Sequence, residues 1–211
     1  MALSAKALQK KRAKKKSKRQ IKVPHSFSSS IINYSHWPVS DCWVPNGLWA
    51  AGIGHVIVTR ANDQGCIAIG LYLIDTFCLG VKDCFVRLGN EEDYQSLLEN
   101  TQGICGELEC VTPSYASTLI QKAVEYAGKA GFKPHPDYLK AKKLLNGILI
   151  DENQKFDFGR DGKPLYIQGP HETQADVRRI MKTLEQNNGT ENYDFMIEVP
   201  DTRELLAEEE V

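Results

Sequence analysis

The segment from Asp75 to Asp83 contains the residue types of this chain that are best suited to chemistry. It places two carboxylates, Asp75 and Asp83, on either side of Cys78 and Lys82, and Gly80 permits an unusual backbone turn between them. Two carboxylates can hold a divalent metal ion that activates water for phosphodiester hydrolysis. Asp75 and Asp83 are therefore candidate catalytic residues of a metal-dependent nuclease or other hydrolase.

Cys78 is a second candidate in this segment. A thiol acts as a nucleophile when an imidazole lies within hydrogen-bond reach, and His55 or His135 could supply that imidazole. A structural interpretation is simpler: a buried strand ends at Asp75, a tight loop follows, and Cys78 packs as a small apolar side chain. We favour this structural interpretation.

His135 is a third candidate, in the segment Lys133-Pro134-His135-Pro136-Asp137. An imidazole titrates near neutral pH, so His135 could act as a general acid or base. It could equally cap a helix that begins at Pro136, and we favour the cap.

The six cysteines do not predict a metal site. Cys78 and Cys84 are separated by five residues and Cys105 and Cys110 by four, whereas structural zinc sites usually contain closer pairs. We expect no metal, no cofactor and reduced thiols.

Charge is divided unevenly along the chain. Residues 1–40 contain ten Lys or Arg and no Asp or Glu, and residues 41–211 contain the other 16 basic and all 27 acidic side chains, so the two parts carry +10 and −11. Blocks of like charge repel each other and commonly act as interaction tails. The cations that we expect to contact nucleic acid are Lys10, Lys11, Arg12, Lys14, Lys15, Lys16, Lys18, Arg19 and Lys22.

This basic arm is suited to the phosphate backbone of RNA or DNA. Each cation can neutralise one phosphate, which gives strong, salt-dependent and sequence-independent binding. Residues 1–22 contain no aromatic side chain, so base stacking is not expected within the arm. A solubilising tail, or a tail that meets an acidic protein surface, has the same composition.

The elements that must position these residues begin with three predicted strands. Residues 55–60 form a β-branched run, Asn62 to Gly65 supply a turn, and residues 66–75 return as a nearly continuous apolar strand. Residues 83–88 follow as a third strand. Together they predict an antiparallel β-meander.

Helices are predicted by their capping residues. Asn90 caps one helix, with Asp93 three residues later, and Thr112 followed by Pro113 begins a second helix that Gly131 ends. Residues 136–145 form a third. Strand runs followed by helices favour an α+β fold, here an antiparallel β-meander packed with helices.

The last third of the chain repeats these patterns. Short strands are predicted at residues 148–150, 156–158, 165–167 and 193–199. Thr173 and Asp176 form a capping box for a helix that ends at Asn188-Gly189.

These patterns divide the chain into three parts. Residues 1–36 form a disordered basic arm and linker, residues 37–199 a single α+β domain with a possible subdivision near residue 147, and residues 200–211 an acidic tail. The three tryptophans at positions 37, 43 and 49 are predicted to pack the start of the domain onto its core. No stretch approaches the roughly 18 to 20 apolar residues of a membrane span, and the start of the chain has no signal-peptide pattern. We expect a cytoplasmic protein that does not contact a membrane.

Several longer segments resemble a set of uncharacterised bacterial proteins, from Gly54 to Asp83 and from Gly162 to Phe195. The shared features are a basic tail, a V-I-V-x-R strand, and the segments GLYLIDTFCLGVKD (70–83), GFKPH (131–135), GKPLYIQGP (162–170) and NYDF (192–195). The resemblance implies a bacterial, cytoplasmic setting and carries over no activity and no catalytic residue.

Three hypotheses for function follow. The favoured one is a non-enzymatic nucleic-acid-binding or ribonucleoprotein accessory subunit, whose arm binds RNA or DNA and whose body contacts protein partners. The second is the metal-dependent hydrolase that uses Asp75, Asp83 and His135. The third is a protein-interaction module whose arm binds an acidic partner.

Overall fold

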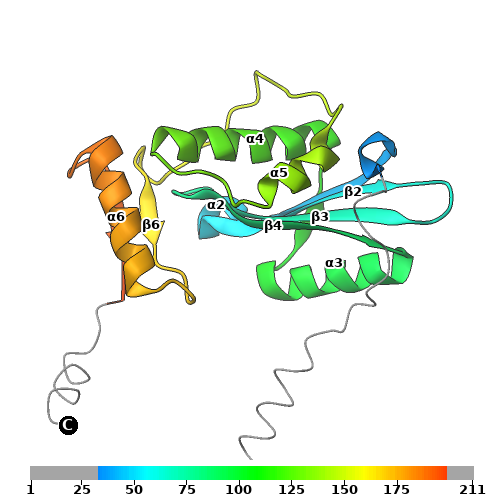
Figure 1. Cartoon of the computed structure of the whole chain (residues 1–211), viewed down its shortest axis with the longest axis horizontal. Helices are drawn as coiled ribbons and strands as arrows, with labels where there is room; N and C mark the ends of the chain where they lie inside the picture. The colour runs from blue at the N-terminus through cyan, green and yellow to red at the C-terminus, as the bar shows by residue number, and fades with distance from the viewer. Residues whose placement is uncertain (1–32, 199–211) are drawn as a thin grey trace, which may run out of the picture. The chain divides into compact units, whose positions relative to one another are not determined.

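The computed structural model of the chain describes residues 33–198. The basic arm and the acidic tail, residues 200–211, lie outside the described residues, as does most of the predicted linker. Residues Tyr34–His36 of that linker form a short 3-10 helix, η1. The described residues, which begin at Asn33, belong to one structural unit, which we call the body (Figure 1).

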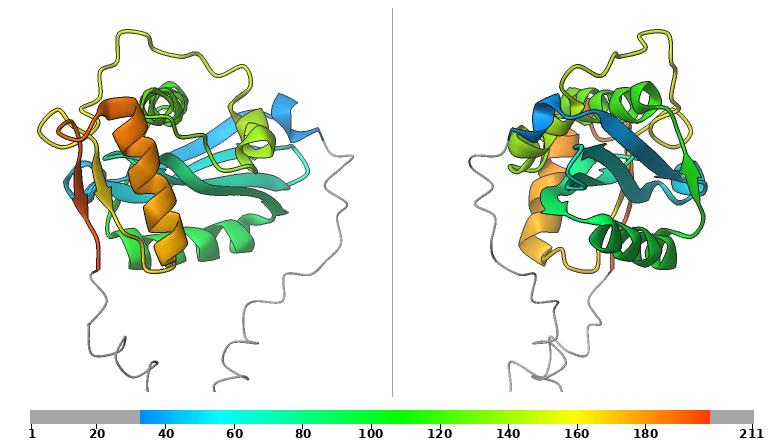
Figure 2. Two further views of the ribbon diagram at one scale, coloured as in Figure 1. Left: turned by 60° about the vertical axis from the view of Figure 1, so that its left-hand side comes forward. Right: turned by 90° about the vertical axis from the view of Figure 1, so that its right-hand side faces the viewer.

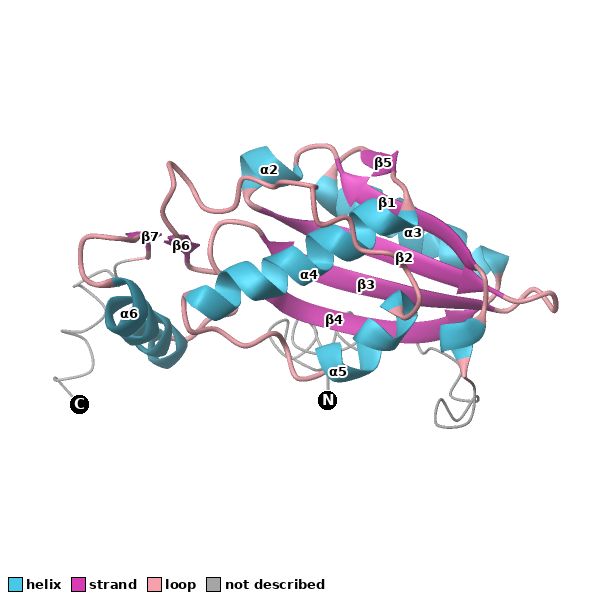
Figure 3. Cartoon of the chain, turned by 90° about the horizontal axis from the view of Figure 1, so that it is seen from above, coloured by secondary structure: helices cyan, strands magenta, loops and turns pink. Residues whose placement is uncertain are grey.

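A five-stranded antiparallel sheet forms the centre of the body. Its strands are β1 (Val39–Pro45), β2 (Ile53–Ala61), β3 (Ile67–Asp75), β4 (Gly80–Gly89) and β5 (Leu108–Cys110), in the order β4-β3-β2-β1-β5 (Figure 3). The predicted meander is confirmed, because β2, β3 and β4 pair consecutively and antiparallel. In the turn between β2 and β3, the side-chain oxygen of Asn62 accepts hydrogen bonds from the backbone amides of Gln64 and Cys66.

Strand β1 has no counterpart among the predicted elements. Proline interrupts a strand pattern because it cannot donate to the ladder, and Pro38 and Pro45 occur only seven residues apart. The structure accommodates both, since Pro38 precedes the strand and Pro45 is its last residue. Trp43 lies within β1, packs against the core on the α3 side, and donates its indole N–H to the hydroxyl of Tyr94 at 2.7 Å.

Helices cover both faces of the sheet, which confirms the α+β fold (Figures 1 and 2). On one face lie α4 (Pro113–Lys129), α5 (Tyr138–Ala141) and the 3-10 turn η2 (Lys142–Leu145); α3 (Glu91–Cys105) lies on the other. The predicted caps are present: Asn90 and Asp93 form a capping box, and the Thr112 side chain accepts a hydrogen bond from the Tyr115 amide. A short helix, α2 (Leu48–Ala51), connects β1 to β2.

The C-terminal part forms a β-α-β segment of β6 (Leu165–Ile167), α6 (Gln174–Asn188) and β7 (Asp194–Met196). Its two strands pair in parallel, which the sequence did not predict, and the Thr173–Asp176 capping box begins α6 as expected. A separate apolar core joins this segment to the body, because Tyr166, Val177 and Leu184 pack with Cys78 and Leu79 of the turn between β3 and β4.

Two predicted strands, at residues 148–150 and 156–158, are wrong. These residues belong to the loop that leads from η2 to β6. Phe156 and Phe158 instead belong to an aromatic cluster. The ring of Phe156 stacks on Trp49 with 5.5 Å between the ring centroids, and the ring of Phe158 stacks on Tyr126 with 5.1 Å between the centroids. The predicted helix at 136–145 is divided into α5 and η2, and the last predicted strand is shorter than 193–199, with Val199 outside the described residues.

Gly80, where β4 begins, has both a left-handed backbone and no room for a side chain. Its φ is +66°, and an added Cβ would lie 2.6 Å from the Ala123 carbonyl oxygen and 2.7 Å from the Ala127 Cβ. The turn between β3 and β4 therefore approaches α4 as closely as only glycine permits.

We predict that Gly80→Ala lowers the free energy of unfolding by about 2 to 4 kcal/mol, the sum of left-handed strain and overpacking. Gly65→Ala is the matched control, since φ is +75° there and nothing lies within 4 Å of the added Cβ; it should cost about 1 to 2 kcal/mol. Urea unfolding of both variants measures the difference. Equal losses would contradict the close approach to α4.

Candidate functional site

A groove of about 580 Å³ lies beside α6, where the C-terminal segment meets the start of β4. We call it the α6 groove. Val81 and Lys82 of β4 line one side of the groove. The loop after α4 contributes Phe132, Lys133 and His135. The remaining lining residues come from α6 and from the residue before its N-cap, and include Glu172, Asp176, Arg179 and Ile180.

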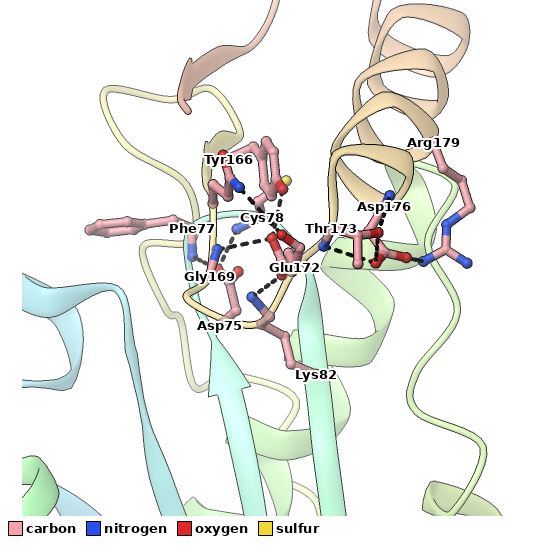
Figure 4. A network of polar contacts seen from close by, with 11 residues as sticks. Asp75, Phe77, Cys78, Lys82, Tyr166, Gly169, Glu172, Thr173, Asp176 and Arg179 are labelled. Atoms are coloured by element: carbon pink, nitrogen blue, oxygen red, sulfur yellow. Dashed lines mark hydrogen bonds and ion pairs between the residues drawn. The ribbon is translucent and has the colours of Figure 1, made fainter. Parts of the chain in front are cut away.

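An ion pair between Lys82 and Glu172 crosses from β4 to the C-terminal segment (Figure 4). The Lys82 ammonium lies 2.7 Å from one carboxylate oxygen of Glu172, and only 16% and 17% of the two side chains are exposed. The other carboxylate oxygen accepts hydrogen bonds from the Tyr166 hydroxyl at 2.6 Å and the Gly169 amide at 2.9 Å. A charged pair shielded from water is stable only when its polar atoms are satisfied in this way.

These contacts determine the protonation of the pair. Burial raises the pKa of Glu172, but the hydrogen bonds from Lys82, Tyr166 and Gly169 together outweigh it, so the net shift is downward. Burial and the hydrogen bond to Glu172 both raise the pKa of the Tyr166 phenol. At neutral pH, Glu172 is therefore an anion, and the Tyr166 phenol that donates to it is neutral.

Asp75 performs a structural task in the turn. Its side chain is buried, and one of its oxygens accepts hydrogen bonds from the amides of Phe77 and Cys78 at 2.9 and 2.8 Å. Burial raises the pKa of Asp75, while the bond from Cys78 and the nearby Lys82 charge oppose that rise.

Asp83, in contrast, is on the surface. Its side chain is 63% exposed and lies 3.7 Å from Nδ1 of His135. Among residues 33–198, no three His, Cys, Asp or Glu side chains are grouped so that they could hold a metal ion. The contacts of Asp75 and Asp83 thus lend no support to a metal-dependent hydrolase, which stays a prediction.

Cys78 is fully buried in the apolar core of the C-terminal segment. Burial and the neighbouring Asp75 carboxylate raise the pKa of its thiol well above the ordinary range. A buried thiol of this kind is a poor nucleophile, because the thiolate is the reactive form. The proposed imidazole partners have other contacts: His55 Nδ1 lies 3.3 Å from the sulfur of Cys105, and His135 faces Asp83.

His135 combines a position in the α6 groove with a role in its own loop. Its Nδ1 accepts a hydrogen bond from the Asp137 amide at 3.3 Å, next to the first residue of α5. The contact orders the turn that leads into α5, but the predicted cap of a helix beginning at Pro136 is wrong, because α5 begins at Tyr138 and its N-cap is Asp137. The acid–base role stays a prediction. The nine cations from Lys10 to Lys22 lie outside the described residues.

Sequence reasoning missed two features of this region. The Lys82–Glu172 pair joins residues 90 positions apart, and the His55–Cys105 contact joins residues 50 positions apart. Neither contact has a local signature in the sequence, although Lys82 lies within the candidate segment from Asp75 to Asp83.

Comparison of the chain with protein-family models, curated proteins and solved structures found no match. In the part of the chain that the structure describes, no helix is both long and apolar enough to cross a membrane.

The Lys82–Glu172 pair is expected to contribute measurably to stability. Lys82→Met leaves a shielded carboxylate without its countercharge, so we predict that Lys82→Met and Glu172→Gln each lower the free energy of unfolding. The double variant should lose less than the sum by about 1 to 2 kcal/mol. Urea unfolding of the four proteins gives this coupling energy, and strict additivity would contradict the pairing.

The stabilisation that the Lys82–Glu172 pair provides should decrease in acid. The pKa of Glu172 in the fold is below its ordinary value of 4.5, so the stabilisation is complete above pH 4.5 and is lost as the pH falls through the lower, folded value. The difference between wild type and Lys82→Met should therefore shrink in acid.

The free energy of unfolding should also depend on pH through His55. Burial lowers the pKa of His55 below its ordinary value of 6.5, so the unfolded chain binds this proton more readily than the folded one. Stability should fall as the pH drops from 6.5 through the folded value. We predict that His55→Gln removes part of the stability loss between pH 7.5 and pH 5.5, measured by urea unfolding.

His171, which is exposed, provides the control. His171→Gln should retain the stability loss of the wild type over the same pH interval. An unchanged loss in His55→Gln would show that burial of this imidazole does not drive it.

Proposed function

We propose that the protein binds nucleic acid, RNA or DNA, by contacts between its basic arm and the phosphate backbone. It acts as an accessory subunit of a nucleoprotein complex and carries out no catalysis. The observation that carries this proposal is the division of charge, +10 in residues 1–40 and −11 in residues 41–211.

The expected loss of affinity as salt rises follows from counterion release. A protein that neutralises six to ten phosphates loses roughly 10³- to 10⁵-fold in affinity between 50 and 200 mM salt. The nine cations from Lys10 to Lys22 fall within that number. Because the remainder of the chain is net acidic and repels a polyanion, most of this attraction belongs to the arm.

The contacts of two candidate catalytic residues, Asp75 and Cys78, give no support to the catalytic alternative. Asp75 holds the turn between β3 and β4, and Cys78 fills an apolar core. Both residues have their contacts within the fold, and neither lines the α6 groove.

We predict that replacing Lys14, Lys15, Lys16 and Lys18 with Gln weakens binding of a 30-nucleotide RNA and of a duplex DNA of equal length. The slope of log affinity against log salt should become shallower by about 3 to 4, the loss of four phosphate contacts. The matched control replaces Lys129, Lys142, Lys143 and Lys155, which are exposed on the body and change the net charge equally. It should leave both affinity and slope nearly unchanged.

Equal effects of the arm and body variants would show that only net charge matters and would refute a role for the arm. Recovery of the protein from cells before and after nuclease treatment then separates nucleic acid from an acidic protein partner. A complex that resists nuclease favours the protein-interaction hypothesis.

A further inference from the structure

The α6 groove gathers cations in a part of the chain that is acidic overall. Residues 41–211 contain 27 acidic and 16 basic side chains, whereas the groove is lined by three cations, Lys82, Lys133 and Arg179, and by two carboxylates, Glu172 and Asp176. Its formal net charge is therefore +1, with His135 neutral. A local basic surface is the condition under which a net acidic body can still contact a polyanion.

The two carboxylates that line the groove are already engaged. Glu172 accepts from Lys82, Tyr166 and Gly169. Asp176 accepts from the Thr173 hydroxyl at 2.6 Å and from the Arg179 guanidinium at 2.9 Å (Figure 4). Their charges are therefore compensated within the groove.

Donors remain on the cations after these contacts. A guanidinium has five N–H groups and an ammonium three, whereas Arg179 uses one for Asp176 and Lys82 uses one for Glu172. Lys133 is exposed and forms no ion pair with a described residue. The groove thus presents N–H donors to an anion.

The apolar lining adds a second requirement for the ligand. Val81 and Ile180 are buried beneath the groove, and Phe132 and Pro134 are partly exposed beside Lys133. A volume of about 580 Å³ lies within the range of small-molecule sites, roughly 300 to 1,000 Å³. A matching ligand carries both an anionic group and a flat apolar group.

We infer that the α6 groove binds one nucleotide unit of the nucleic acid that the arm contacts. Lys133 and Arg179 bind the phosphate, and the base lies against Phe132. This inference rests on the proposed function, since an arm that attracts a nucleic acid brings nucleotides to the body of the same chain. A base can stack on an aromatic ring, and the arm cannot supply this contact because residues 1–22 contain no aromatic residue.

The test uses the full-length chain, labelled with ¹⁵N and titrated with adenosine 5′-monophosphate at 150 mM salt. We expect one saturable set of amide shifts at residues 131–135 and 172–183. Adenosine and inorganic phosphate, titrated separately, should each bind at least tenfold more weakly, because each lacks one of the two groups.

Variants at the groove provide the second measurement. Lys133→Gln should weaken binding of the monophosphate about tenfold, and Phe132→Leu, which keeps the apolar packing, should weaken it by a similar factor. Lys129→Gln, an equal change of charge at an exposed position outside the groove, should have no effect.

Failure of this inference and failure of the proposed function give different results. The four-glutamine arm variant should bind the monophosphate as wild type does, although it loses affinity for the RNA. If the monophosphate causes no shifts in the groove while the arm still binds RNA, the groove assignment is wrong and the proposed function stands. Equal binding of inorganic phosphate, or binding of hexaglutamate in its place, would also overturn the nucleotide assignment.

Discussion

The hydrogen bonds that the Asp75 carboxylate accepts hold the turn on which the rest of the body depends. They fix the amides of Phe77 and Cys78 as the chain leaves β3, and in doing so direct the carbonyls of Thr76 and Phe77 outward. The amides of Gly159 and Leu165 bind these two carbonyls at 2.9 and 3.1 Å. The C-terminal segment is thereby attached to the turn through the backbone as well as through the side chains of α6. This is why a carboxylate that resembles a catalytic residue in the sequence is buried in the fold.

The same turn explains the position of the α6 groove. Leu165 is bound to the turn, so its neighbour Tyr166 lies in the apolar core beside Cys78, and the Tyr166 hydroxyl donates to Glu172. Glu172 then faces Lys82, which is seven residues beyond Asp75 on the returning strand. Ion pairing in a shielded place costs desolvation of both charges, and the two additional donors to Glu172 offset that cost. The groove is the space left where two separately packed cores meet and where side chains from both remain partly exposed.

Local patterns in the sequence predicted the parts of the fold that depend on neighbouring residues. The meander follows from Asn62 and from the apolar strands on either side of it, and the helix starts follow from caps such as Asn90 and Thr173, whose partners are three residues away. The missed features depend on distant residues. Phe156 and Phe158 alternate like a strand but fill a cluster on Trp49 and Tyr126, and the prolines that bracket β1 lie outside its interior. The Lys82–Glu172 pair has no signal within any window of sequence, because only the folded turn brings the two residues together.

In the function that we propose, electrostatics on two length scales allow a net acidic body to contribute to binding of a polyanion. At physiological ionic strength the Debye length is about 8 Å, so the general repulsion from the acidic residues 41–211 is largely screened beyond that distance. On our proposal, an anion inside the groove lies within this distance of Lys133 and Arg179, and the carboxylates Glu172 and Asp176 in the same lining are offset by their ion pairs with Lys82 and Arg179. In the proposed function the arm acts by the opposite principle, since its many cations attract a polyanion through counterion release, and that attraction weakens as salt rises. On our proposal, the arm therefore supplies the initial attraction to a nucleic acid, and the groove supplies a contact that salt affects less.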